Sequence, residues 1–355
     1  MSLLWMDCDA DFERLIDVAC EYEVRARGDY FDKKGEETRK IFYRDMRYNI
    51  TFLYTSYLLQ DGKIMEDYAR WLFRLMAPIL KDLSPKETAD YLYVHLDAIR
   101  DGIRTVFSGK AQAQLLELID RAGDKVALES SLPPAQPQAS VHYEEEVQRY
   151  LHLLFQKNTR QLPLLIQEFV NRGIPLTDLY VEILAESMRR IGELWHTGQI
   201  SVATEHYCTS ATLTVMSQLY SIIFAQKRKH RSVLCACPGT ELHELGARMI
   251  ADLFENDGWD TIYLGAAVPE KALFDAIRTQ QPDLVALSVT MPQHLIVCQE
   301  LTTALRAAFP DIRIAVGGHA FHSTQAIWSK WPIDIYTEDA RELLEKANEA
   351  LDNPT

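Results

Sequence analysis

The spacing of apolar positions predicts a helical first part of the chain. Apolar residues recur at three- and four-residue intervals from Leu72 to Leu80, the spacing of a helix with one buried face. Ser84 and Glu87 enclose Pro85 in a capping box, which predicts that another helix begins there. Strand signals are scarce before residue 128 and aromatic residues are frequent. We therefore expect residues 1–128 to form an all-α domain with many aromatic side chains in its core.

A proline- and serine-rich segment follows this domain. The run ESSLPPAQPQAS at residues 129–140 has no apolar periodicity, so residues 129–141 are predicted to be a linker. Residues 142–229 then read as a four-helix bundle. The third helix should run from about Leu176 to His196, where Thr197-Gly198 ends it. Ser201 is a suitable N-cap for the fourth helix.

The period of the pattern changes at Arg231. Short β-rich runs alternate with helical stretches over residues 230–355, which predicts a doubly wound, mostly parallel sheet of the flavodoxin-like or Rossmann-like kind. Such sheets bind ligands beyond the carboxyl ends of their strands. The predicted strands are Ser232–Cys237, Asp260–Leu264, Leu284–Val289, Ile312–Val316 and Ile333–Tyr336, and the helices His243–Asn256, Glu270–Thr279, His294–Phe309 and Asp339–Leu351. The whole chain is therefore expected to be multidomain, α and α/β.

Composition narrows the classes of function. The chain has 355 residues, of which 47% are apolar and 25% charged, and its net charge is −14. This acidic balance argues against a nucleic-acid partner. No apolar run reaches the ~18 residues needed to cross a bilayer, and no basic segment of a signal peptide opens the sequence. The six cysteines form no CxxC pair. We therefore expect a cytoplasmic protein without membrane or nucleic-acid partners.

The loop after the first predicted strand presents a histidine at the ligand-binding edge. His243 is expected to open the following helix, and imidazole is a good ligand for cobalt. A carboxylate two residues earlier, Glu241, is placed to accept the other ring N–H and so fix the tautomer. Gly246 allows a cofactor or a backbone to approach closely. Taken singly, His243 could equally be an ordinary residue at a helix end.

Three elements in order resemble those of cobalamin-binding domains, which carry Asp-x-His-x-x-Gly, then Ser-x-Leu, then Gly-Gly. The resemblance implies that His243 is the lower ligand of cobalt and that the serine, the threonine and the glycines line the pocket of the nucleotide tail. Two residues depart from the family pattern, a glutamate in place of aspartate and a threonine in place of leucine. The matching elements are Glu241-Leu242-His243-Glu244-Leu245-Gly246, Ser288-Val289-Thr290 and Gly317-Gly318.

A second cluster lies in the predicted bundle. Trp195 is followed, after nine residues, by Glu205-His206, which resembles the cap of CarH-type B12 photoreceptors. The resemblance implies that Trp195 packs on the adenosyl group of adenosylcobalamin and that Glu205 hydrogen-bonds it, with Val202 and His206 lining the same cap. It also implies that His196 takes the vacated position on cobalt after light cuts the Co–C bond. Judged alone, each of these residues is an ordinary core or helix-end residue.

Together the two clusters favour a light sensor without catalytic turnover. It would bind adenosylcobalamin base-off and change conformation or oligomeric state when the Co–C bond is cut. Light-dependent self-association and a downstream protein partner are expected. The alternative is a corrinoid protein that carries methyl groups for a methyltransferase system. A methyl carrier has no use for a cap of adenosyl size, so the pattern from Trp195 to His206 separates the two.

The N-terminal domain leaves several hypotheses open. It suits a globin-like sensor module, in which His95, its only histidine, would be either a haem ligand or an ordinary residue. The architecture also resembles the photocobilins, which bind biliverdin beside B12. Arg39, Arg44 and Arg47 could pair with bilin propionates. Cys8 and Cys20 could attach a bilin, although idle thiols are the better interpretation. A plain dimerisation bundle is equally in keeping with the sequence.

Overall fold

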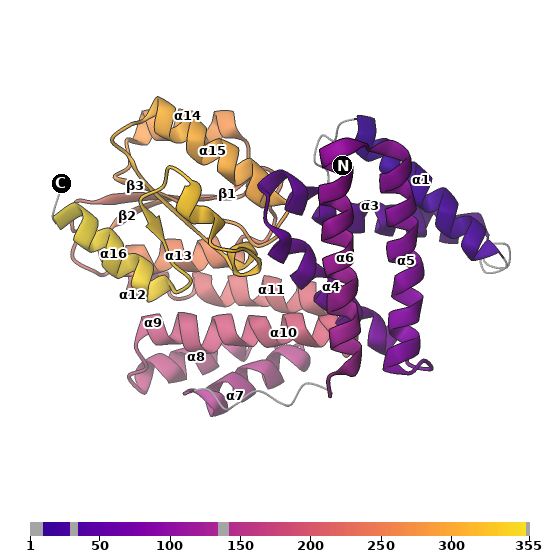
Figure 1. Ribbon diagram of the computed structural model, residues 1–355. Helices are drawn as coiled ribbons and strands as arrows, with labels where there is room; N and C mark the ends of the chain where they lie inside the picture. The colour runs from indigo at the N-terminus through magenta and orange to yellow at the C-terminus, as the bar shows by residue number, and fades with distance from the viewer. Residues whose placement is uncertain (1–9, 29–34, 134–141, 353–355) are drawn as a thin grey trace. The chain divides into compact units, whose positions relative to one another are not determined.

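The computed structural model describes residues 10–28, 35–133 and 142–352 (Figure 1). The chain divides into two compact units. The first contains the N-terminal helices together with residues 291–296 and 320–327, and the second contains the remainder from residue 136 onward. The predicted limits of the domains and of the linker stay predictions. Cys8 lies outside the described residues.

The first unit is helical throughout its described N-terminal part, as predicted. α1 packs against α5 and α4 packs against α6. Ser84 and Glu87 form the predicted capping box. α4 buries a face that includes Tyr68 and Phe73, whereas Ile79 is 62% exposed, so the helix was predicted correctly but its buried stripe was not. The helices are α1 (Ala10–Ala26), α3 (Glu36–Leu59), α4 (Gly62–Ile79), α5 (Pro85–Val106) and α6 (Gly109–Ser131).

The second unit begins with the helical bundle. The predicted third helix is present, but its middle is a π-helical segment, η1, that interrupts the α-helical repeat before Glu186. Ser201 caps the fourth helix through a hydrogen bond from the backbone N–H of Thr204 at 3.2 Å, as predicted. The elements are α7 (Glu144–Phe155), α8 (Leu162–Asn171), α9 (Leu176–Asp178), η1 (Leu179–Ala185), α10 (Glu186–His196), α11 (Val202–Ser217) and α12 (Tyr220–Ile223).

The predicted parallel sheet is also present, with five strands in the order β2-β1-β3-β4-β5. This is the flavodoxin-like order of doubly wound sheets. Helices α14 and α15 cover one face, and α13 and α16 cover the other (Figure 1). The elements are β1 (Ser232–Pro238), α13 (Leu245–Asn256), β2 (Asp260–Val268), α14 (Glu270–Gln280), β3 (Leu284–Ser288), α15 (His294–Ala308), β4 (Arg313–Gly317), two 3-10 turns (His319–Ser323 and Ile327–Lys330), β5 (Ile335–Tyr336) and α16 (Ala340–Asp352).

Helix α13 connects the bundle with the sheet. Its residues Met249 and Leu253 belong to the apolar core of the bundle. On another side of the same helix, Phe254 packs edge-on against Trp259 in the core of the sheet. Because both cores share this helix, the position of its N-terminal end depends on the packing of both. No helix of the described residues is long and apolar enough to cross a membrane.

Candidate functional site

The predicted residues gather at the carboxyl edge of the sheet. The strand order reverses between β1 and β3, which are adjacent and parallel. A crevice for ligands forms at such a switch point. The loop after β1 carries Glu241 and His243, and Ser288 and Thr290 follow at the end of β3. The Gly317-Gly318 pair ends β4, where Ser288 and Gly317 are direct partners in the sheet.

Glu241 is the buried centre of this edge. Its side chain is fully buried. Oε1 accepts hydrogen bonds from Nδ1 of His243 at 2.6 Å and from the backbone N–H of His243 at 3.0 Å. Oε2 accepts one from the backbone N–H of Thr290 at 2.9 Å. These hydrogen bonds to the buried carboxylate join the loop after β1 to the loop after β3.

His243 lies in the loop, not in the helix. α13 begins at Leu245 with Glu244 as its N-cap residue, so the prediction that His243 opens the helix was wrong. The two hydrogen bonds to Glu241 hold the histidine in a turn that does not have helical geometry. Because Nδ1 donates to the carboxylate, the neutral ring presents Nε2 as its ligand atom. The side chain of His243 is 57% exposed.

The charges around His243 favour its protonated form. The hydrogen bond to Glu241 raises its pKa, burial opposes that rise, and the charges of Glu241 and Glu205 add to it. A charge has this effect only at short range. The carboxylate of Glu205, in the first turn of α11, is therefore within electrostatic range of His243.

The glycines of the predicted pocket make room at specific atoms. A Cβ on Gly246 would lie 3.9 Å from Oγ of Ser288, so these two residues are neighbours across the pocket. Gly318 has φ +104° and a Cβ there would lie 2.4 Å from the carbonyl oxygen of Val289. A Cβ on Gly317 would lie 3.1 Å from the carbonyl oxygen of Thr337. The pair therefore permits a backbone approach that other residues would block.

An irregular pairing of β2 with β1 adds residues that the sequence did not indicate. The register shifts after Cys235 and again after Ala236, as at a β-bulge. Beside this shift, the backbone N–H of Ala267 donates to the carbonyl of Glu241 at 2.8 Å. Tyr263 donates its hydroxyl to Oε2 of Glu244 at 2.9 Å. Tyr263 and Ala267 thus support the His243 loop, although no motif marked them.

The upper cluster lies on the exposed side of α11. Glu205 accepts hydrogen bonds from Nδ1 of His206 at 2.6 Å and from the hydroxyl of Thr209 at 3.0 Å. The side chain of His206 is 76% exposed, and Val202 is 52% exposed. The interpretation that Glu205 and His206 lie near the inner face of the bundle was wrong. The inner face of α11 consists of Cys208, Ala211, Thr212, Val215 and Met216.

Trp195 and His196 end α10 beside this cluster. Trp195 is 38% exposed, and His196 is half-buried. The chain reverses at Gly198, which has φ +69°, as the predicted break required. The backbone N–H of Gln199 then returns to the carbonyl of Leu194 at 2.8 Å. This tight turn holds the end of α10 next to the start of α11.

An exposed leucine adjoins His243. Leu242 is 44% exposed although it lies between the fully buried Glu241 and His243. With Trp195 and Val202 it is among the exposed large apolar side chains of this unit. Leu242 stood in the motif, but only the structure shows that it points outward.

In the first unit, His95 is buried and both of its ring nitrogens have partners. Nδ1 donates to Glu23 at 2.7 Å, and Nε2 accepts from the side-chain amide of Asn49 at 2.7 Å. The pocket beside His95 has a volume of about 10 Å³, the space of roughly one water molecule. This pocket does not fit a haem or a bilin, and His95 has no nitrogen left for iron.

The other residues considered for a second ligand are also engaged. Arg47 pairs with Glu13, and Arg44 pairs with Asp45 at 3.7 Å. Cys20 is buried, and burial raises the pKa of its thiol to about 12, which makes it a poor nucleophile for attachment of a bilin.

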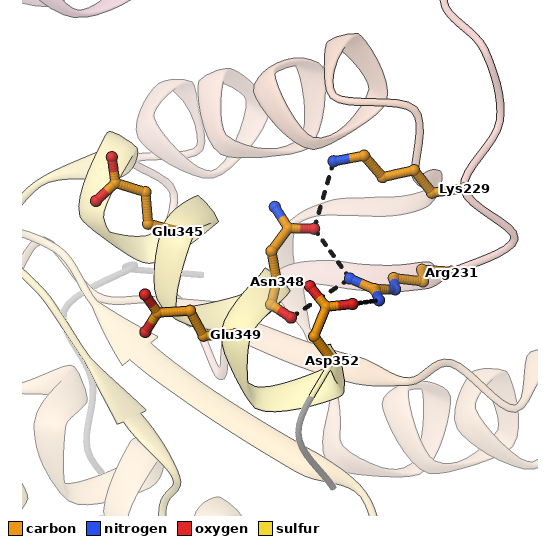
Figure 2. Close-up of a pocket in the computed structure, with 6 residues that line it drawn as sticks. All are labelled: Lys229, Arg231, Glu345, Asn348, Glu349 and Asp352. Carbon is orange, nitrogen blue, oxygen red and sulfur yellow. Dashed lines mark hydrogen bonds and ion pairs between the residues drawn. The ribbon is translucent and has the colours of Figure 1, made fainter.

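A surface pocket of about 530 Å³ lies away from the predicted site. Figure 2 shows that Asn348 of α16 is bonded to both Lys229 and Arg231, the residues that lead into β1. Oδ1 of Asn348 accepts from Arg231 at 3.1 Å, and Arg231 also pairs with Asp352. Because Arg231 precedes β1 and His243 follows it, this pocket is at the opposite edge of the sheet. Its paired charges hold the C-terminal helix in place.

Comparisons with known proteins agree with the predicted B12 domains. Residues 231–345 match a B12 binding domain family, and residues 146–220 match a second B12 binding domain family. The chain is 30% identical over 166 residues to the HTH-type transcriptional repressor CarH of Myxococcus xanthus, which covers 46% of this chain and 54% of CarH. It is 31% identical over 149 residues to CarA of the same organism, 41% of this chain and 50% of CarA. The chain thus spans about half the length of these two relatives.

Corrinoid proteins are also similar. The methanol–corrinoid protein of Methanosarcina barkeri is 21% identical over 230 residues, 64% of this chain and 88% of that protein. The solved structure of the Methanosarcina barkeri monomethylamine corrinoid protein superposes with a TM-score of 0.50 at 18% identity, covering 59% of this chain and 98% of that one. This likeness shows the fold alone. The chain therefore carries B12-binding domains joined to a helical domain.

The described residues fit a corrinoid at this edge. One imidazole nitrogen points outward, its ring is oriented by a buried carboxylate, and glycines open the space beside Ser288. Glu241, in place of the family's aspartate, reaches both His243 and Thr290. The glutamate side chain is thus long enough to bond both the histidine and the neighbouring loop.

Proposed function

We propose that this protein is a light sensor that binds adenosylcobalamin base-off with His243 as the lower ligand of cobalt. The observation that carries the proposal is that the buried carboxylate of Glu241 orients His243 at the carboxyl edge of the sheet, where the strand order reverses. The cofactor supplies a weak Co–C bond that absorbs visible light. The protein supplies the oriented histidine below, and above it a cap that contains Trp195, Val202, Glu205 and His206.

The cap is suited to hold a polar organic group. Glu205 has a half-buried carboxylate, already bonded to His206 and Thr209, at the start of α11. Trp195 and Val202 offer exposed apolar surface nearby. An adenosyl group combines an aromatic base with hydroxyls, so it matches such a mixed surface. We further propose that His196 replaces the adenosyl group as upper ligand in the lit state.

The pocket of the nucleotide tail is assigned to the second set of residues. Gly246, Ser288 and Thr290 border it on one side, and Gly317-Gly318 on the other. The neighbouring positions of Gly246 and Ser288 support this assignment. The tail would add apolar and polar contacts that the lower ligand alone does not offer.

A corrinoid methyl carrier is the second candidate, and the similarity to methanogen corrinoid proteins favours it. The deciding experiment is the absorption spectrum of the full chain with adenosylcobalamin, in the dark and after illumination, for the wild type and His243→Ala. A light sensor gives a histidine-ligated dark spectrum that light converts, and the variant loses histidine ligation. A dark spectrum identical in wild type and variant contradicts the assignment of His243.

The output of the sensor is proposed to be a change of assembly. Removal of a group from beneath the cap would expose apolar surface around Trp195 and Val202. Size-exclusion chromatography in the dark and in the light tests this directly. One elution volume in both states, with complete photolysis, removes the assembly switch. We further propose that the protein lies in the cytoplasm and passes its signal to a downstream protein. In this proposal it binds no nucleic acid and catalyses no reaction.

A direct binding experiment tests whether the first unit takes biliverdin as a second ligand. The pocket beside His95 is too small for it, so a bilin would have to bind elsewhere. Mixing the full chain with biliverdin and recording the absorption spectrum is the test. A red-shifted, structured band supports a second chromophore, and an unchanged spectrum leaves B12 alone.

A further inference from the structure

A continuous line of contacts runs from the bundle to the loop that holds His243. It starts at Tyr180 of the π-helical segment η1, which is fully buried. Its hydroxyl donates to Oδ2 of Asp252 on α13 at 2.8 Å. Oδ1 of the same carboxylate accepts from Nε of Arg248, one turn earlier on α13, at 3.2 Å. The buried carboxylate is thus shared between the bundle and the helix that follows the ligand loop.

Arg248 continues the line toward the sheet. Its guanidinium lies 5.0 Å from the ring centre of Tyr220 in α12 and 4.9 Å from that of Tyr263 in β2. Both distances are within the range of cation–π attraction. One ring belongs to the bundle and the other to the sheet, so the position of Arg248 depends on both.

Tyr263 completes the line at the ligand loop. Its hydroxyl donates to Oε2 of Glu244 at 2.9 Å, and Glu244 follows His243 directly and caps α13. A Cβ on Gly265 would lie 3.1 Å from the same Oε2, so the bulged strand leaves room for this carboxylate. The loop is therefore held at two carboxylates, Glu241 from within the sheet and Glu244 from the side of Tyr263.

We propose that Tyr180, Asp252, Arg248, Tyr263 and Glu244 form a contact chain that positions the His243 loop according to the packing of the bundle. The inference rests on the proposed function, because it assigns the loop a cobalt ligand. When the bundle moves, the hydrogen bond from Tyr180 to Asp252 breaks, and Arg248 is then the one donor of the chain that still bonds this carboxylate. Arg248 shifts with Asp252 and moves off the ring of Tyr263. The hydrogen bond from Tyr263 to Glu244 is weakened as a result.

The bundle contacts the sheet helices at a second place, which provides a matched control. Arg341 of α16 pairs with Asp178 at 2.9 Å and with Glu182 at 2.9 Å. These ion pairs join the same bundle to the α/β domain, and no side chain of α13 or of the His243 loop takes part in them. Arg341→Gln therefore weakens the junction without breaking the contact chain.

The test compares full-length wild type, Tyr180→Phe, Tyr263→Phe, the double variant and Arg341→Gln, each loaded with adenosylcobalamin in the dark. The visible spectrum gives the ratio of histidine-ligated to histidine-free cofactor. Each phenylalanine keeps the ring and removes one hydrogen bond, so each ratio should fall about fivefold. In the double variant this ratio should fall by less than the product of the two single reductions. Arg341→Gln should keep the wild-type ratio.

The outcomes separate the contact chain from the proposed function. If the wild type shows no histidine ligation, the proposed function fails and the chain has no ligand to position. If the wild type is histidine-ligated but Tyr180→Phe has the same ratio, the contact chain is wrong and the function stands. An equal loss of histidine ligation in Arg341→Gln would mean that any weakening of the junction has this effect, which also overturns the contact chain. Asp252→Asn, which keeps the shape of the side chain, replaces Tyr180→Phe if that variant does not fold.

Discussion

Oε1 of Glu241 accepts a hydrogen bond from Nδ1 of His243 at 2.6 Å, and this carboxylate is fully buried. A buried carboxylate that accepts from the ligand ring fixes the tautomer and raises the basicity of the ring. The other oxygen of Glu241 accepts from the backbone of Thr290 at 2.9 Å. The orientation of the histidine is therefore coupled to the loop after β3.

Glu241→Ala should weaken cobalamin binding by about 10- to 100-fold, the usual effect of losing a group that orients a metal-bound histidine. Spectral titration with cobalamin measures it. Glu241→Asp is the matched control: it restores the family's residue, so histidine ligation should persist with a smaller loss of affinity. Equal affinity of wild type and Glu241→Ala would contradict the orienting role.

Alanine substitutions at Gly318 and Gly246 should have separate effects, the first on folding and the second on cofactor binding. Gly318→Ala places a Cβ against the carbonyl of Val289 in a backbone conformation with φ +104°, so it should lower the free energy of unfolding by about 2–4 kcal/mol. Gly246→Ala adds a Cβ at an ordinary 3.9 Å from Oγ of Ser288. It should fold at least as stably as the wild type.

The same pair of variants tests the tail pocket. Gly246→Ala narrows the space beside Ser288 and should weaken cobalamin binding about tenfold by overpacking, while thermal unfolding without cofactor stays unchanged or rises. Unchanged affinity would show that the nucleotide tail does not pass Gly246. A wild-type melting temperature for Gly318→Ala would show that the β4 turn can relax.

Local signals allowed much of the fold to be predicted. Ser84, Ser201 and Gly198 act within one turn of the chain, and the structure has each in its predicted role. The strands were found because apolar runs and helical runs alternate. The motif around His243 was recognisable because its residues lie in three short segments of the sequence.

The parts that failed depend on distant contacts. His243 lies outside the helix because Glu241 is drawn into bonds that include Thr290, 49 residues away. The inner face of α11 was misjudged because apolar residues occur on all sides of that helix, and small ones such as Ala211 and Cys208 pack inward. Tyr263 reaches Glu244 only because β2 bulges beside β1. No local pattern carries that information.

Asp252 should make stability depend on pH between about 4 and 6. Burial raises the pKa of its carboxyl from the usual 3.8 to about 6, although Tyr180 and Arg248 act in the opposite direction and the charge of Glu255 adds to the rise. The folded protein holds the proton of Asp252 more tightly than the unfolded chain does. The contribution of this group to the free energy of unfolding is therefore complete below about pH 4 and is lost as pH rises through 6. The full effect is about 3 kcal/mol.

Urea unfolding of wild type and Asp252→Asn across this pH range measures the contribution of Asp252. The difference in free energy of unfolding between the two should shift in favour of the variant as pH rises, and it should level off above about pH 6. Tyr180→Phe removes a donor that lowers the pKa, so its window should move to higher pH. A constant difference between wild type and Asp252→Asn would show that Asp252 does not titrate in this range.

His196 should decide the spectrum of the lit state. It ends α10 directly after Trp195, the proposed apolar contact of the adenosyl group, and a tight turn connects it with the start of α11. His196→Ala should bind adenosylcobalamin and respond to light at the wild-type rate, because the proposed ligand in the dark is His243. Its lit product should lack the spectral signature of a second nitrogen ligand. His206→Ala is the matched control, since it removes the other, exposed histidine of the cap and should keep the wild-type lit spectrum. If His206→Ala changes that spectrum and His196→Ala does not, the upper ligand comes from α11 and the assignment to His196 is wrong.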